Sequence, residues 1–113
     1  MFVIKQSDTY KWPVRFSLPS ATKAGQFDTH NVTLEFKRLP QSALAQMTST
    51  DGVTDESLCR QWVVGWEGVY DEEQQPVPFS DSAFGQFLEY PSVASTIVVA
   101  YIDSMSGGAK RKN

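Results

Sequence analysis

The chain has 113 residues, of which 41% are hydrophobic and 20% charged, and its formal net charge is −3. This length predicts one domain, and the hydrophobic fraction is too high for a disordered chain. No window approaches about eighteen consecutive apolar residues, and the N-terminus lacks the pattern of a secretory signal, so we expect neither a membrane span nor export. The single cysteine, Cys59, excludes an internal disulfide and suits a reducing cytoplasm.

The charges are unevenly distributed along the chain. Residues 1–46 contain six basic and three acidic residues, whereas residues 47–103 contain Arg60 against ten acids. Residues 104–113 then add three bases. The acidic stretch argues against nucleic acid as a partner, because phosphates would be repelled. It predicts either a solvated acidic face or salt-sensitive head-to-tail attraction between neighbouring copies.

Two strands are predicted within residues 1–39. Alternate residues are apolar from Tyr10 to Leu18 and again from Val32 to Phe36, which is the pattern of strands with one buried face. Pro13 lacks an N–H for the sheet and places the first of these strands at an edge. We expect an antiparallel hairpin across an eleven-residue loop, preceded by residues 2–4 as a short strand or a tucked end.

About four helices are predicted within residues 40–106. Pro40 begins a short helix with Leu44 and Met47 inward, and Thr54 caps the next one. Leu58, Trp62 and Trp66 are spaced by four residues, which predicts that this second helix continues through Trp66. Ser80 begins a third helix, and Pro91 separates it from the last. The expected fold is a single α+β domain over residues 1–108, with a hairpin or small sheet packed on the helices and a basic mobile tail at 109–113.

The last helix is apolar around almost its whole circumference. One stripe, which includes Ile97 and Tyr101, can pack on the domain, while Val98, Val99 and Ile102 lie off that stripe. We predict that these three residues bind a protein partner and contribute to self-association, unless the hairpin covers them. The predicted structural core is Trp62, Trp66, Phe79, Phe84, Ile97 and Tyr101.

The residue types do not favour an enzyme. His30 is the sole histidine and is interpreted as a surface residue, whereas Cys59 has no adjacent base and is interpreted as a buried structural residue. Asp71, Glu72 and Glu73 fall in a predicted turn and lack the spacing of a calcium loop. No Cys/His cluster and no phosphate-binding glycine loop is present in the sequence. We therefore expect a protein that acts by binding, with no metal and no cofactor.

The order of motifs after residue 32 resembles the tail assembly chaperones of long-tailed (siphovirus-like) bacteriophages or prophages. A strand that ends at Phe36-Lys37-Arg38-Leu39 precedes Trp66-Glu67-Gly68-Val69, and an acidic turn leads to Pro76-Val77-Pro78-Phe79-Ser80. Pro91-Ser92-Val93 and Ala100-Tyr101 then come before the basic tail. One departure is that members of this family usually carry a glycine before Pro-Val-Pro, where this chain has Gln74 and Gln75.

This resemblance implies a small, non-catalytic protein of virion morphogenesis in the host bacterial cytoplasm. Such proteins bind the aggregation-prone tape measure protein, help to recruit the tail tube protein, and are absent from the mature virion.

Two other classes remain as alternatives. The first is a structural virion component, such as a tube or connector protein, although more than half of this chain is predicted to be helical. The second is a small inhibitor or anti-restriction protein, which only acidity and size suggest. Mass spectrometry of purified virions distinguishes a chaperone from a virion component, because a chaperone is missing from the particle.

Overall fold

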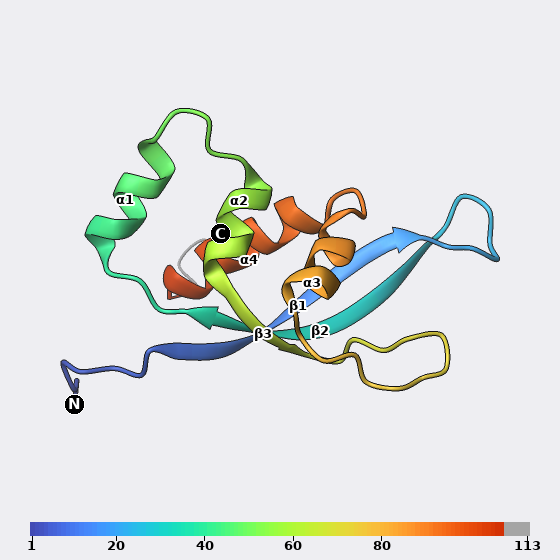
Figure 1. Ribbon diagram of the computed structural model, residues 1–113, viewed down its shortest axis with the longest axis horizontal. Coiled ribbons are helices and arrows are strands. Elements are labelled where there is room, and N and C mark those ends of the chain that lie inside the picture. The colour runs from blue at the N-terminus through green and yellow to red at the C-terminus, as the bar shows by residue number, and fades with distance from the viewer. Residues whose placement is uncertain (108–113) are drawn as a thin grey trace.

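The computed structural model describes residues 1–107 and consists of a three-stranded antiparallel sheet with four helices (Figure 1). The predicted α+β fold is therefore confirmed. Its buried residues, which come from strands and helices alike, form a connected hydrophobic cluster. The basic tail predicted at residues 109–113 lies outside the described residues.

A long hairpin forms two of the three strands. β1 (Thr9–Pro19) pairs with β2 (Phe27–Lys37) in a register that places Val14 opposite Val32. The even-numbered residues face the helices, and the buried ones are Val14, Phe16, Val32, Leu34 and Phe36. β1 is at the edge of the sheet, as Pro13 predicted. The strands run closer to the turn than expected, so the connecting loop is shorter than eleven residues.

The third strand corrects the prediction for the segment around Trp66. The helix that begins after Thr54 is α2 (Asp55–Trp62), and the chain then continues directly as β3 (Val63–Glu67), which pairs with β2. Trp66 is thus a strand residue opposite Leu34, and strands are not confined to residues 1–39. A spacing of four fits one face of a helix, but four is also an even number and fits one face of a strand. The spacing of the two tryptophans therefore could not distinguish a helix from a strand.

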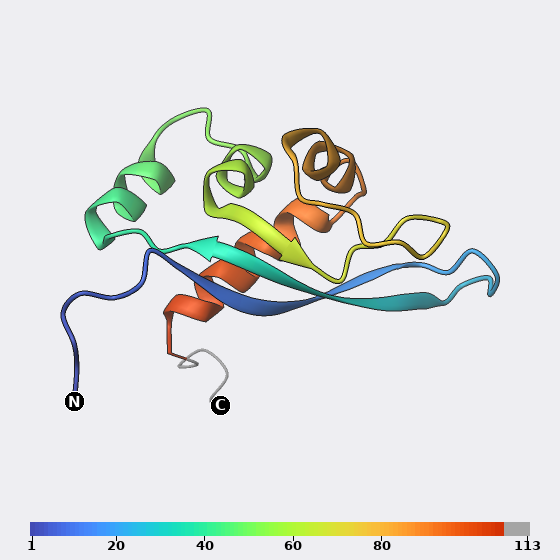
Figure 2. The ribbon, with the colours of Figure 1, turned by 60° about the horizontal axis from the view of Figure 1, so that its bottom comes forward.

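The four helices follow the predicted order. α1 (Gln41–Ser49) and α2 precede β3, and α3 (Asp81–Leu88) and α4 (Val93–Met105) follow it. Figure 2 shows α1, α2 and α3 in a row along the sheet. Aromatic contacts attach α3 and α4 to the even-numbered sheet face, through the Phe16–Phe87 and Phe36–Tyr101 pairs. The opposite sheet face carries exposed polar residues, among them Lys11 and Glu67, whose side chains form an ion pair 2.7 Å long.

The segment between β3 and α3 forms a fixed corner. The Asp71 carboxylate accepts N–H bonds from Glu73 and Gln75, each 2.9 Å long, and so closes an acidic turn. Gln74 has a φ of 61°, in the left-handed region that glycine occupies most easily. Gln74 is one of the two residues at which the sequence departs from the glycine of the chaperone pattern that it resembles. Ser80 then caps α3 by accepting the N–H of Ala83, as predicted.

The first residues do not form the short strand or the tucked end that the sequence suggested. Residues 1–4, which are all apolar, are exposed and precede β1 as an arm (Figure 1). The register of the hairpin uses no residue before Thr9. Because both edges of the sheet are already defined by β1 and β3, this arm lies outside the sheet.

Candidate functional site on the outer face of the C-terminal helix

One face of α4 is anchored in the core. Val93, Ile97 and Tyr101 are almost completely buried, and they follow one another at intervals of four residues. The Tyr101 ring stacks on Trp62, with 4.2 Å between ring centroids and 12° between the ring planes. Its hydroxyl donates to the carbonyl oxygen of Lys37 at 2.8 Å. α4 therefore touches both α2 and the end of β2, which fixes its rotation about its own axis.

The tyrosine that anchors α4 stays neutral over the physiological pH range. Burial, with a smaller contribution from the neighbouring Tyr10, raises the pKa of Tyr101 to about 12. Tyr10 adds a second attachment, because its hydroxyl lies 2.7 Å from the Ser104 hydroxyl. These polar contacts hold the C-terminal half of α4 against β1 and β2.

The remaining predicted core residues divide into two groups. Trp62 and Phe84 are buried, together with Ile97 and Tyr101. Trp66 and Phe79 are only partly covered and pack against the core from the corner. Their rings meet edge to face at 5.1 Å, and the Trp66 indole N–H donates to the Val77 carbonyl oxygen at 2.8 Å. They fix the corner and do not form the centre of the domain.

The three residues predicted to bind a partner are not equivalent. Val99 is 59% exposed and Ile102 is 41% exposed, so both are available on the surface of α4. Val98 is partly buried and packs against the core. Met105, which the sequence analysis did not single out, is as exposed as Ile102. It lies three residues after Ile102, which is the spacing of neighbours on one helix face.

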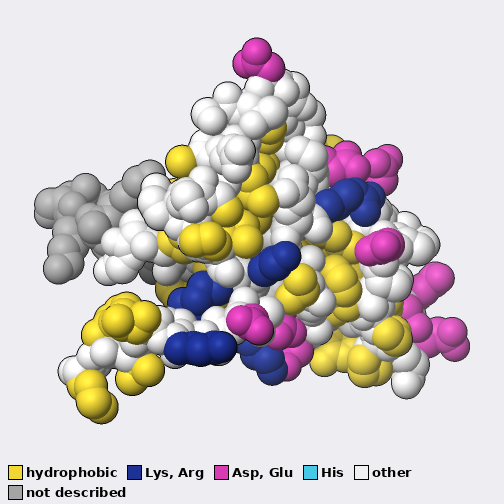
Figure 3. All heavy atoms as spheres, turned by 60° about the vertical axis from the view of Figure 1, so that its left-hand side comes forward, with side chains coloured by type: hydrophobic (Ala, Val, Ile, Leu, Met, Phe, Trp, Pro, Cys, Tyr) yellow, Lys and Arg dark blue, Asp and Glu magenta, His cyan; other side chains and the backbone are white. Residues whose placement is uncertain are grey.

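A shallow groove of about 270 Å³ lies between α1 and the C-terminal half of α4. Its apolar lining includes Leu44 from α1, Ile102 and Met105 from α4, and the edges of Trp62 and Tyr101. Figure 3 views the molecule from this side, where hydrophobic side chains gather. Leu44 points to the domain as predicted but is only partly covered. The sequence could not reveal the groove, because its two walls are about sixty residues apart along the chain.

Trp62, one of the residues that line this groove, has a buried polar atom without a partner among the described residues. This atom is Nε1 of the indole ring. Leaving a buried N–H unpaired costs about 1–3 kcal/mol.

The residues considered for chemistry lie apart from this surface and from one another. His30 is exposed on β2, whereas Cys59 is buried on α2 with its Sγ 3.4 Å from the Ala94 carbonyl oxygen. Burial raises the pKa of the Cys59 thiol to about 12, so it is protonated and weakly nucleophilic at neutral pH. Across residues 1–107, no His, Cys, Asp and Glu side chains are grouped as a metal site would require. No described helix has the length and hydropathy needed to cross a membrane.

Comparison with known proteins gives no relative for this chain. No protein-family model, no curated protein and no solved structure matches it.

Proposed function

We propose that this protein is a non-catalytic tail assembly chaperone of a long-tailed bacteriophage. It binds the tape measure protein in the host cytoplasm and promotes assembly of the tail tube. The observation that carries the proposal is the exposed apolar face of α4 next to the groove with α1. The order of sequence motifs from residue 32 onward supports the assignment to this class.

The groove suits an apolar helical segment. Val99 and Ile102 present branched aliphatic side chains, and Met105 adds a flexible one that adapts to different partner surfaces. The opposite wall, α1, contains no charged residue, so covering it does not bury an unpaired charge. An amphipathic helix laid in such a groove contributes side chains at intervals of three and four residues. Tape measure proteins are long and largely helical, and they can offer this pattern repeatedly.

Within this proposal Val98 has a supporting role. It packs on the core while Val99 and Ile102 contact the partner, so the three residues act together although they differ in exposure. When the partner is absent, the same apolar face pairs two copies of the protein. A complex of several copies along one tape measure protein then keeps that protein soluble while the tail tube protein is recruited.

The test is the substitution Ile102→Glu, studied by co-expression with the tape measure protein encoded by the same phage. A charge in the middle of the apolar contact should leave a folded protein that is more monomeric and recovers little soluble partner. Circular dichroism checks the fold, sedimentation checks the oligomer, and the soluble partner fraction checks the function.

Phe27→Glu is a matched control, because Phe27 is also an exposed apolar residue but lies at the far end of the hairpin. It should retain both oligomer and partner solubility. If Ile102→Glu stays folded with both properties unchanged, the proposed surface is wrong. If Phe27→Glu alone loses the partner, the binding surface is the hairpin end.

A further inference from the structure

A second groove, of about 700 Å³, lies between the corner that follows β3 and helix α3. Its apolar lining includes the partly buried side chains of Trp66, Val77 and Phe87. Tyr70 and Tyr90 flank it and are 60% and 56% exposed. The Trp66 N–H bond to the Val77 carbonyl oxygen, together with the closed acidic turn, holds one wall in place. The groove is therefore a preformed surface with two exposed aromatic rings.

The charged residues of this groove all have the same sign. Asp71, Glu72 and Glu89 are among its lining residues, and no Lys or Arg is. In the described part of the chain, the two ion pairs are Lys11–Glu67 and Arg60–Glu56, and neither involves these three carboxylates. A long basic side chain matches such a surface, since its aliphatic stem packs on apolar groups while its charge meets carboxylates and aromatic faces.

The chain itself contains a segment of the required chemistry. Lys110, Arg111 and Lys112 are consecutive and follow two glycines and an alanine. Two cations of the sheet region are already engaged, because Lys11 is paired with Glu67 and Arg38 lies 4.8 Å from the Tyr10 ring. Residues 110–112 are the longest run of consecutive basic residues in the sequence.

The distance along α4 favours binding of this segment to the groove of another copy. The groove adjoins the N-terminal end of α4, through Glu89 and Tyr90, whereas the described chain ends just past the C-terminal end of α4 (Figure 1). The thirteen residues of α4 separate these ends by roughly 20 Å. The four Cα–Cα steps from Gly107 to Arg111 span at most about 14 Å, so the basic run of the same copy comes near the groove only when fully extended along α4. The basic run of another copy is not restricted in this way.

We propose that the segment Lys110–Lys112 of one copy binds the acidic aromatic groove of the next copy. This contact joins two different surfaces, so a pair keeps an unused groove on one copy and an unused basic segment on the other and can extend the assembly head to tail. It does not depend on the chaperone proposal and uses a surface separate from the groove beside Ile102. Because it rests on exposed charges, the association should weaken as salt is raised.

The first test measures binding of a fluorescent peptide with the sequence of residues 107–113. The protein is the full chain with Lys110, Arg111 and Lys112 each changed to Gln, which removes competition from its own basic segment. Binding at low salt should fall by roughly ten-fold or more with Glu72→Lys and Glu89→Lys together. The control, Asp28→Lys with Asp51→Lys, changes the net charge equally at exposed positions outside the groove. Equal losses in the two double variants, or no binding by the parent protein, would overturn the proposal.

The second test is complementation between two full-length variants. In one variant Lys110, Arg111 and Lys112 are changed to Gln and the groove is intact. The other carries Glu72→Lys and Glu89→Lys in the groove and keeps the basic segment. Both variants also carry Ile102→Glu, which removes pairing through the apolar face of α4. Neither should then self-associate alone, whereas their mixture should form a one-to-one dimer in analytical ultracentrifugation at low salt. A mixture that sediments as the sum of its components contradicts the contact. Because Ile102→Glu should keep full peptide binding, failure here is distinguishable from failure of the chaperone proposal.

Discussion

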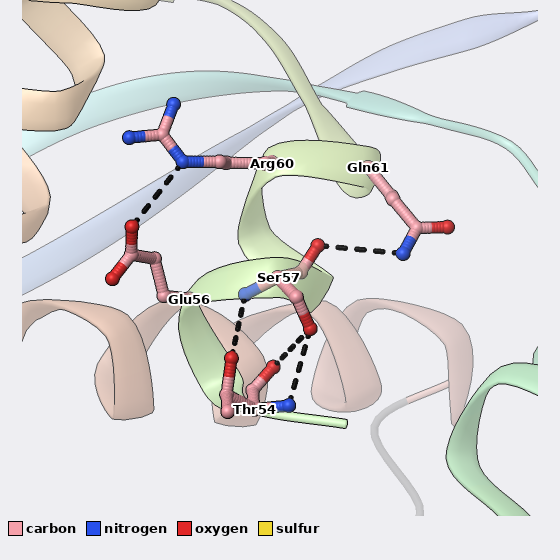
Figure 4. A network of polar contacts seen from close by, with 5 residues as sticks. All are labelled: Thr54, Glu56, Ser57, Arg60 and Gln61. Carbon is pink, nitrogen blue, oxygen red and sulfur yellow. Dashed lines mark hydrogen bonds and ion pairs between the residues drawn. The ribbon is translucent and has the colours of Figure 1, made fainter. Parts of the chain in front are cut away.

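Helices α1 and α2 are consecutive and almost equally long, yet the fold holds them very differently. α2 buries Leu58, Cys59 and Trp62, whereas α1 buries none of its nine residues. The N-terminus of α2 has a capping box, in which the Thr54 hydroxyl accepts the Ser57 N–H and the Ser57 hydroxyl accepts the Thr54 N–H (Figure 4).

The charges at the ends of the two helices also differ, and they stabilise α2 but not α1. α2 has two acidic residues in its first turn and Arg60 in its last turn, where each sign is favoured by the helix dipole. Arg60 also pairs with Glu56 one turn earlier (Figure 4). α1 starts after Pro40 without a side-chain cap and has no acidic residue in its first turn or basic residue in its last.

This difference teaches that burial and capping, and not length, decide which short helix is firmly held. Isolated helices of this length are marginal in water. α2 is stabilised by the core, while α1 covers the groove beside α4 from outside. Elements with few buried contacts open at low free-energy cost, and binding surfaces are often formed by such elements. α1 is thus the adaptable wall of the proposed partner site, and α2 is its fixed base.

The test with the largest expected effect on stability removes one apolar side chain from each helix. Trp62→Ala should reduce the free energy of unfolding by about 3–5 kcal/mol, because it leaves a large cavity beside Tyr101. That is a large share of the roughly 5–15 kcal/mol typical of a domain. Leu44→Ala should cost less than about 1 kcal/mol, because Leu44 is only partly covered. Urea denaturation measures both, and similar losses would contradict the difference between the helices.

A second test uses alkaline pH. Burial, assisted by the charges of Asp55 and Glu56, raises the pKa of Cys59 from 9.0 to about 12. The folded state thus favours the neutral thiol. The contribution of Cys59 to the free energy of unfolding is therefore complete below about pH 9 and is lost as pH rises towards 12. By about pH 11 the protein should lose about 2–3 kcal/mol through this residue.

The matched variant is Cys59→Ala, whose unfolding free energy should fall less between about pH 8 and pH 11. Tyr101, whose pKa is also raised to about 12, contributes the same alkaline loss to both proteins and cancels in the comparison. α1 contains no titratable side chain. A parallel pH dependence in the two proteins would show that Cys59 does not anchor α2 as a neutral buried group.

The test with the smallest expected effect on stability concerns the N-termini of the two helices. Thr54→Ala removes the acceptor for the Ser57 N–H and should destabilise the protein by about 1 kcal/mol. Ser42→Ala, in the first turn of α1, should change stability by less than about 0.5 kcal/mol, because Ser42 is exposed and its helix lacks a side-chain cap. Thermal unfolding followed by circular dichroism measures both. A loss at Ser42 as large as that at Thr54 would mean that α1 is capped as firmly as α2.

The regular parts of the fold were accessible from sequence because each has a local physical cause. Alternation predicted the hairpin, since only a half-buried strand needs apolar side chains at every second residue. Thr54 and Ser80 predicted two helix starts, because their hydroxyls satisfy N–H groups that the helix leaves unpaired. Pro13 predicted an edge strand, because it lacks the N–H that a central strand donates to its neighbour.

The candidate site was only partly predictable. Ile102 and Val99 were predicted to lie off the buried stripe of the last helix, and both are exposed. Met105 and the wall supplied by Leu44 were missed, because a helical stripe says which residues share a face but not which distant element lies beside it. The acidic groove was missed similarly, since it depends on the meeting of Glu72 and Glu89 from two separate segments.

The sequence by itself determined the fold class, most element boundaries and the asymmetry of charge, all of which follow from local periodicity and composition. Only the tertiary structure decided that the chain after Trp62 becomes a strand. There the edge of β2 offers hydrogen-bond partners, and the Glu35 side chain lies so close to Gly65 that an added Cβ would be 2.9 Å from a carboxylate oxygen. Local spacing cannot encode that choice, because the partners of Val63 and Trp66 are supplied by residues about thirty positions earlier in the chain.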